Sequence, residues 1–101
     1  MGGNDIIHQA MRLRIMAALV TLAPGAALEF ARLKTLVEAT DGNLGAHLET
    51  LEKAGYVAVE KRFVERKPQT RIAATASGRR AFRTHVAYLR GILDGAADAD
   101  R

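Results

Sequence analysis

A leucine pattern with helical spacing runs through residues 40–56, TDGNLGAHLETLEKAGY. Positions i, i+4 and i+7 of one helix face are all leucine: Leu44, Leu48 and Leu51. Thr40 or Asp41 can cap the N-terminus, and Gly55 stands where a helix ends in the left-handed conformation. The other faces carry only small or polar residues: Gly42, Asn43, Ala46, Glu49, Thr50 and Lys53. This surface suits insertion into a DNA major groove, and it suits plain solvent exposure equally well.

Three more helices are predicted around this one. The first begins at Asn4 or Asp5 and runs to about Leu22, with apolar residues on two opposite sides. The second spans residues 30–37 or 30–38 and turns four apolar residues inward: Phe30, Leu33, Leu36 and Val37. Because only residues 39–41 separate it from the leucine-patterned helix, the pair predicts a helix-turn-helix. The last helix, capped by Thr75 or Ser77, has a wide apolar arc with His85 on its flank.

After Gly55 the apolar period changes from helical to alternating. Residues 56–64 predict one strand, residues 65–69 a turn, and residues 69–75 a second strand, which together make a β-hairpin. Its tip and flanks hold five basic side chains: Lys61, Arg62, Arg66, Lys67 and Arg71. Contact with phosphates explains this placement, although a solubilising rim around an exposed turn is the alternative.

Charge distribution sharpens the picture. The 101-residue chain carries a net charge of +4. Residues 1–55 hold five basic and six acidic side chains, whereas residues 56–101 hold ten basic and five acidic ones. The positive charge therefore follows the leucine-patterned helix, which itself has little, so arginines and lysines elsewhere are needed to hold nucleic acid. Arg32, Lys34 and Arg79 are further candidates.

Composition also excludes several classes of protein. The chain has no cysteine, which rules out disulfides and a thiol nucleophile, and its one serine, Ser77, stands at a helix start. No apolar run reaches the roughly 20 residues that span a bilayer, and no secretory signal is present, so we expect a cytoplasmic protein without a membrane partner. His8, His47 and His85 are scattered, with no metal-ligand spacing. We therefore expect no enzyme activity, no cofactor and no metal site.

The order of elements resembles that of the winged-helix transcriptional regulators of the MarR and ArsR type, especially small stand-alone winged helix DNA-binding domains. The resemblance rests on the segments MRLRIMAAL, LEFARLK, TDGNLGAHLETLEKAGYVAVEKRF, RKPQTR and TASGRRAF. It implies a mainly α fold with a small β-hairpin wing, formed as one domain by residues 1–101. The helix-turn-helix would occupy about residues 29–54, the wing about 56–75 and a dimerisation helix about 76–95.

The resemblance also implies a function, a sequence-specific transcriptional regulator that binds a pseudo-palindromic operator in double-stranded DNA as a homodimer. Its recognition helix, residues 41–54, would meet DNA through Thr40, Asn43, Ala46, His47 and Thr50. The basic wing, residues 62–71, would lie on the backbone or minor groove through Arg62, Arg66, Lys67 and Arg71. Gly45 departs from the family pattern, which usually has serine there. Either the helix backbone approaches DNA closely at Gly45, or one phosphate contact is missing.

The apolar arcs of the first and last helices predict the dimer interface, because a small domain cannot cover both. The expected contacts come from both helices: Ile7, Met11, Tyr88, Leu89 and Ile92. His8 and His85 could approach each other across that interface. Two alternatives stay open, namely a winged-helix module that binds another protein, supported by Glu49 and Glu52, and a repressor controlled by a ligand or metal at the dimer interface. The effector is unknown.

Overall fold

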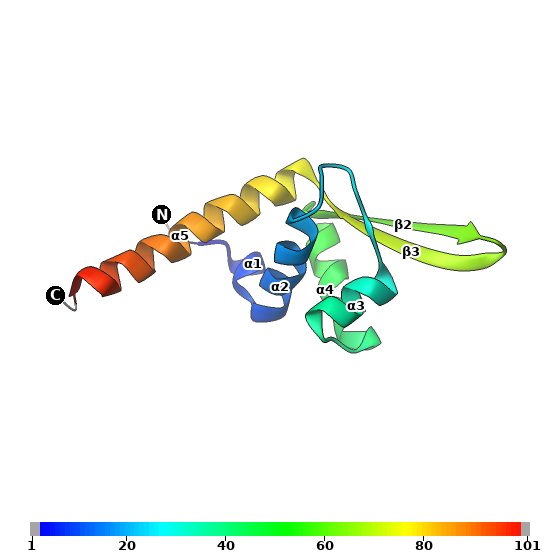
Figure 1. Ribbon diagram of the computed structural model, residues 1–101, viewed down its shortest axis with the longest axis horizontal. Helices are drawn as coiled ribbons and strands as arrows, with labels where there is room; N and C mark the ends of the chain where they lie inside the picture. The colour runs from blue at the N-terminus through cyan, green and yellow to red at the C-terminus, as the bar shows by residue number, and fades with distance from the viewer. Residues whose placement is uncertain (1–2, 100–101) are drawn as a thin grey trace.

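The computed structural model describes residues 3–99 of the chain. Within them, helices α1 (Asp5–His8), α2 (Ala10–Val20), α3 (Phe30–Val37) and α4 (Asp41–Lys53) form a small body. A long helix, α5 (Ala76–Ala99), and a hairpin of strands β2 (Val57–Val64) and β3 (Lys67–Ala74) project from opposite ends of this body (Figure 1). The molecule is therefore elongated, with extents of 60 × 25 × 22 Å. The predicted fold class, mainly α with a β-hairpin wing, is confirmed.

A three-stranded antiparallel sheet joins the wing to the body. Strand β1 (Leu28–Glu29) pairs with β3 through Leu28 opposite Ile72, and β3 pairs along its whole length with β2. The base of the hairpin packs on the helices, because Val57, Ile72 and Ala74 belong to the same buried cluster as the leucines of α4. Toward the turn the residues of both strands are mostly exposed, so one part of the sheet belongs to the core and the rest projects into solvent.

The leucine pattern predicted α3 and α4 well. Leu44, Leu48 and Leu51 are buried, and Thr40 caps α4 by accepting a hydrogen bond from the backbone N–H of Asn43 at 3.1 Å. Gly55 has a φ of 82°, the left-handed value expected just after the helix. The prediction for Leu36 is wrong, because its side chain is 46% exposed while Leu33 and Val37 cover the core.

The first predicted helix is two helices rather than one. Gln9 breaks it with an extended backbone, and the Gln9 side chain accepts from the N–H of Arg12 to cap α2. Asn4 caps α1 in the same way by accepting from the N–H of Ile7. The break turns α1 against the core, so that Ile7 is fully buried within the monomer. Ile7 therefore has no surface left for a partner, contrary to its predicted place in a dimer interface.

The hairpin turn is tighter than predicted. Only Glu65 and Arg66 connect the strands, with φ values of 51° and 67°, and β3 already begins at Lys67. Positive φ at both central residues is the geometry that matches the twist of a two-residue hairpin. Pro68 lies inside the strand, opposite Phe63. The neighbouring pair, Val64 and Lys67, closes the turn and is hydrogen-bonded, so by the alternation of an antiparallel ladder Phe63 and Pro68 form a non-hydrogen-bonded pair. The missing N–H of Pro68 therefore costs no hydrogen bond between the strands.

Helix α5 starts in close contact with the corner between α4 and β2. Thr75, and not Ser77, caps it by accepting from the N–H of Gly78, and the Thr75 hydroxyl also donates to the carbonyl of Gly55. A Cβ atom at Gly78 would lie 2.0 Å from the carbonyl oxygen of Tyr56, so only glycine fits. The helix continues to Ala99, one turn beyond its predicted end, and all its residues after Leu89 are exposed.

Candidate nucleic-acid interface

The outward face of α4 is open and nearly free of bulky groups. Asn43 and Ala46 are exposed, whereas Thr50 is half-buried and its hydroxyl donates to the carbonyl of Ala46 at 3.3 Å. Thr40 is exposed but its hydroxyl oxygen already caps the helix. These four predicted residues lie together along the N-terminal and central turns of α4. The side-chain amide of Asn43 is the freest polar group among them.

The acidic side chains of α4 are partly neutralised by lysines. Lys34 of α3 lies 2.8 Å from the carboxylate of Asp41, and Lys53 lies 3.0 Å from that of Glu49. Both pairs are exposed, so each adds little to stability. They do reduce the negative potential that a phosphate would meet at the two ends of the helix. Lys34, a predicted DNA contact, is therefore already paired with α4.

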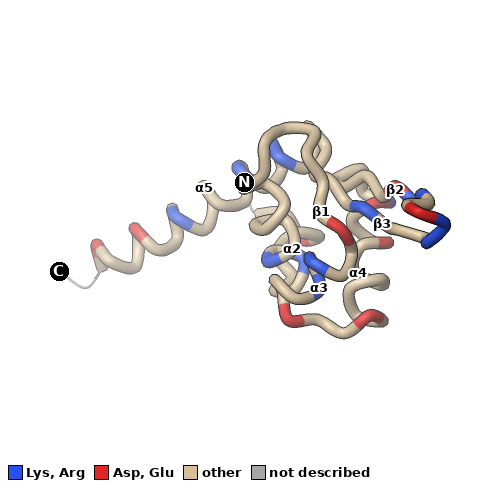
Figure 2. Tube along the Cα trace, turned by 45° about the vertical axis from the view of Figure 1, so that its right-hand side comes forward, with Lys and Arg blue, Asp and Glu red and all other residues tan. Residues whose placement is uncertain are grey.

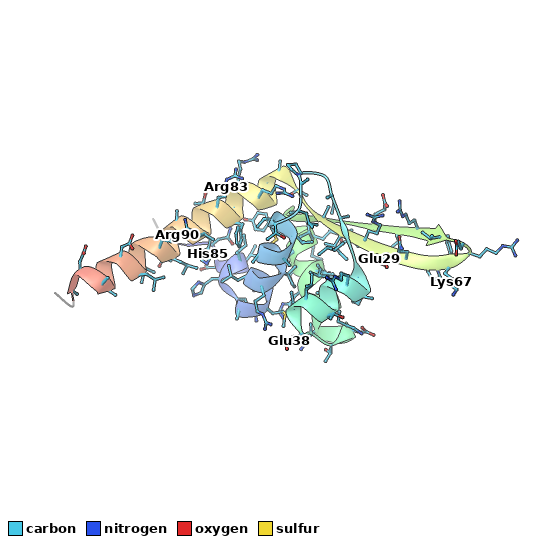
Figure 3. The ribbon with its side chains drawn as sticks, viewed as in Figure 1. Glu29, Glu38, Lys67, Arg83, His85 and Arg90 are labelled. Carbon is cyan, nitrogen blue, oxygen red and sulfur yellow. The ribbon has the colours of Figure 1, made fainter. Side chains whose placement is uncertain are left out.

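Positive charge gathers at the tip of the wing, where Figure 2 shows Lys and Arg around the turn. Arg66 lies in the turn, Lys67 follows it, and both are exposed; Lys67 stands at the far end of the hairpin in Figure 3. Arg62 and Arg71 lie further back and are more constrained. Arg62 lies 3.5 Å from Glu60 and donates to the Gln69 side chain, and Arg71 donates to the carbonyl of Ala27.

An exposed aromatic ring is the feature of the wing that the sequence pattern did not reveal. Phe63 shares one face of its strand with Val59 and Lys61 by alternation. The strand has left the body at this point, however, so Phe63 is 75% exposed. An apolar ring therefore lies among the cations of the tip, on the side of the wing that continues the core-facing surface.

A shallow groove separates α4 from the wing. Phe30, Leu48 and Val59 line it, and Gly45 and Glu49 of α4 face Lys61 and Thr70 of the wing. No atom lies within 4 Å of the position that a Cβ would take at Gly45. Packing within the protein therefore does not require glycine at this position.

Arg79 of α5 contacts the C-terminal end of α2. Its guanidinium donates to the carbonyls of Val20, Leu22 and Ala23 at 3.3, 2.9 and 3.2 Å, which closes the C-terminal end of α2. These orphan carbonyls need donors, and Arg79 supplies them from α5. Arg79 therefore joins α5 to the end of α2, and its guanidinium is engaged with these three carbonyls.

The positions of His8 and His85 differ from those expected. His8 and His85 approach within one protomer, with ring nitrogens 3.3 Å apart, rather than across a dimer. His85 of α5 is fully buried and contacts Asn4 and His8, against the prediction that it lies on the flank of its helix (Figure 3). Within residues 3–99 no three His, Asp or Glu side chains form a cluster that could hold a metal ion. No helix of the same residues is long and apolar enough to cross a membrane.

Comparison with known proteins decides the family. A family model described as "Winged helix DNA-binding domain" matches residues 11–93, which include the helix-turn-helix, the wing and most of α5. The chain belongs to this winged helix DNA-binding domain family. An uncharacterized protein of Methanocaldococcus jannaschii is 36% identical to it over 81 residues, which are 80% of this chain and 85% of that protein.

Solved structures agree with the assignment. A transcriptional regulator homologue from Pyrococcus horikoshii OT3 superposes with a TM-score of 0.83 at 27% identity, covering 92% of this chain and 89% of that one. A MarR family regulator from Silicibacter pomeroyi shares the fold, with a TM-score of 0.69 at 20% identity. The match covers 91% of this winged helix chain but only 59% of the MarR protein. The protein is thus a DNA-binding winged-helix regulator, a class that carries out no catalysis.

Proposed function

We propose that this winged helix domain is a sequence-specific transcriptional regulator that places α4 in the major groove and the wing on the DNA backbone or minor groove. One observation carries the proposal. One groove separates α4 from the wing, and Lys61 of the wing lines it while Arg66 and Lys67 lie further out at the tip. A duplex can therefore contact both elements at once. Asn43 has the side-chain amide that pairs with the N6 and N7 edge of adenine.

We also propose that it binds a pseudo-palindromic operator as a homodimer. The distal half of α5 supports this, since Tyr88, Ile92 and Leu93 are exposed although they are large and apolar. Leu89 is half-buried beside them, and Met11 of α2 is half-buried against the core. Pairing two copies through α5 would cover this surface and set two recognition helices about 34 Å apart, one turn of DNA.

The wing supplies the test of DNA binding. In the double variant Arg66→Ala/Lys67→Ala we expect weaker binding to every duplex, because each lost phosphate contact lowers the slope of log affinity against log salt by roughly one unit. Fluorescence anisotropy with a labelled duplex over a salt series measures this slope. Arg80→Ala/Arg83→Ala is the matched control, since it removes the same charge from exposed positions of α5.

Two results would contradict the proposal. An unchanged salt slope in the wing variant removes the wing from the DNA model. Failure of the wild type to bind heparin or any duplex at low salt favours instead a module that binds another protein. Selection of duplexes from a random pool then tests the finer claim, because a dimer that reads sequence must recover two half-sites related by two-fold symmetry.

A further inference from the structure

Arg12 links three helices at the side of the recognition helix. Its Nε atom donates to the carbonyl of Ile6 in α1, and its Nη1 atom lies 3.2 Å from Nδ1 of His47 in α4. Its own backbone N–H is held by the side chain of Gln9 at the start of α2. The Ile6 carbonyl therefore holds the guanidinium beside His47, and the Gln9 side chain holds the backbone from which the Arg12 side chain extends.

This contact determines which nitrogen of His47 carries the proton. A guanidinium has only donors, so Nδ1 of His47 must accept, and the neutral ring then bears its hydrogen on Nε2. Burial, and after it the positive charge of Arg12, lower the pKa of His47 from its usual value of 6.5, which keeps the ring neutral at pH 7. Arg12 thus leaves Nε2–H as the only hydrogen-bond donor of the His47 ring.

The free N–H of His47 is open to the outside. Within residues 3–99, His47 Nε2 has no hydrogen-bond partner in the protein. It is not buried either, because among the described residues the one buried side-chain nitrogen or oxygen without a partner is Nε of Arg79. His47 is half-buried on the flank of α4 that faces α2, about 100° of rotation from the outermost residue, Ala46. A group on the flank of a groove-inserted helix meets the sugar-phosphate backbone rather than the base edges.

We propose that Arg12 and His47 form a phosphate-contacting pair on the α2 side of the recognition helix, with Arg12 as the positioning residue. The inference rests on the proposed DNA-binding function. The His47 Nε2–H donates to a phosphate oxygen, and the Arg12 guanidinium adds a fixed positive charge beside it. Helix α4 alone carries Asp41, Glu49 and Glu52 against Lys53, so the pair supplies charge that α4 lacks.

The first test reads the histidine directly in the free protein. Long-range nitrogen–proton NMR spectra of the full chain at pH 7.5 should show His47 as the Nε2–H tautomer. In Arg12→Ala the ring should populate the Nδ1–H tautomer as well, and its pKa should rise. Arg14→Ala is the control, because Arg14 lies in the same helix and contacts Glu38 at 3.2 Å instead of α4. A cationic ring or an Nδ1–H ring in the wild type would overturn the positioning role.

The second test measures binding to a duplex of unrelated sequence. Arg12→Ala and His47→Ala should each weaken it by roughly fivefold to tenfold, typical of one charge-assisted contact. The double variant should be less than additive, because Arg12 acts partly through His47. In His47→Gln, whose amide donates without help, Arg12→Ala should cost less. Arg14→Ala should change affinity less than Arg12→Ala does.

The outcomes separate this inference from the function it rests on. If the wild type binds DNA and His47→Ala binds equally well, the phosphate contact is overturned while the proposed function stands. A change in the selected sequence at one position, with non-specific affinity intact, would assign His47 to a base edge and overturn the phosphate contact. Wild-type protein that binds no duplex removes both proposals, while the tautomer measured in the free protein still reports on the Arg12 contact.

Discussion

A buried histidine ties the two ends of the chain together. His85 accepts the backbone N–H of Asn4 on Nδ1 at 2.9 Å, so its Nε2 carries the proton and donates to Nδ1 of His8. Asn4 also donates to the Tyr56 hydroxyl, and Gly3 lies so close to the His85 ring that an added Cβ would be 2.6 Å away. The neutral ring is therefore built into the fold, since a proton on Nδ1 would face the Asn4 donor.

This network predicts a loss of stability in mild acid. Burial, and after it the neighbouring His8, lower the pKa of His85 from its usual 6.5, so the unfolded chain takes up a proton more readily than the folded one. The contribution is full above pH 6.5 and is lost as the pH falls below it. Urea unfolding at fixed protein concentration should show this decline, and His85→Asn should reduce it. His47, whose pKa is lowered too, should contribute to the part that persists in this variant.

A substitution at Gly45 should change the stability of the fold and the affinity for DNA in opposite directions. Since nothing lies within 4 Å of the Cβ position, Gly45→Ala should stabilise the fold by up to about 1 kcal/mol, the usual gain inside a helix. The same methyl group would stand in the groove between α4 and the wing, so we expect lower affinity for DNA. Gly91→Ala is the control, because it is equally open in α5. Thermal unfolding and duplex titration measure both effects, and unchanged affinity would show that the backbone does not approach DNA there.

At the scale of elements, local sequence signals predicted α3, α4 and the wing. They did not predict features that depend on contacts distant in sequence, such as the burial of His85. The leucine spacing and the Thr40 and Gly55 caps are local and sufficient for α4. His85 looked like a flanking residue because its partner Asn4 lies 81 positions away. The tight turn was missed since Glu65 and Arg66 are not the glycine or asparagine that usually adopt positive φ.

The same limits apply to the predicted DNA-binding residues. Pattern and family resemblance placed Asn43, Ala46 and Lys67 on the exposed surface where the structure has them. They could not show that Arg79 closes the end of α2, because its carbonyl partners are more than 50 residues away. Arg12 went unnoticed for the same reason, since its contact with His47 spans 35 positions. Charge can be counted from a sequence, but its pairing depends on tertiary packing.

The wing combines charged and apolar contacts that respond differently to salt. Phe63 presents an apolar ring at the cationic tip, where a side chain of this kind can pack against sugars or a base step of the minor groove. Phe63→Ser should therefore lower affinity for duplex while leaving the salt slope unchanged, because no counterion is released by an apolar contact. Anisotropy titrations over a salt series distinguish this from the loss of Arg66 and Lys67. Unaltered affinity would exclude Phe63 from the interface.

At the scale of the whole molecule, the exposed stripe of α5 predicts the oligomeric state. Ile92→Glu should convert a dimer into a monomer, because a charge buried between two copies of α5 costs more than the contact provides. Leu36→Glu is the matched control, since Leu36 is 46% exposed on α3 and Ile92 is 51% exposed on α5. Sedimentation at micromolar concentration measures the mass of each. A monomeric wild type would contradict the homodimer.

The close contact between Gly78 and the carbonyl of Tyr56 couples any movement of α5 to the rest of the domain. The first turn of α5 rests directly on the corner that joins α4 to β2, with no side chain between them to absorb a movement. In the proposed dimer, a change in the angle at which two copies of α5 cross would therefore swing each recognition helix and wing together as one body. The distance between half-sites would follow from that angle, so a ligand lodged between the helices could govern operator fit without touching DNA.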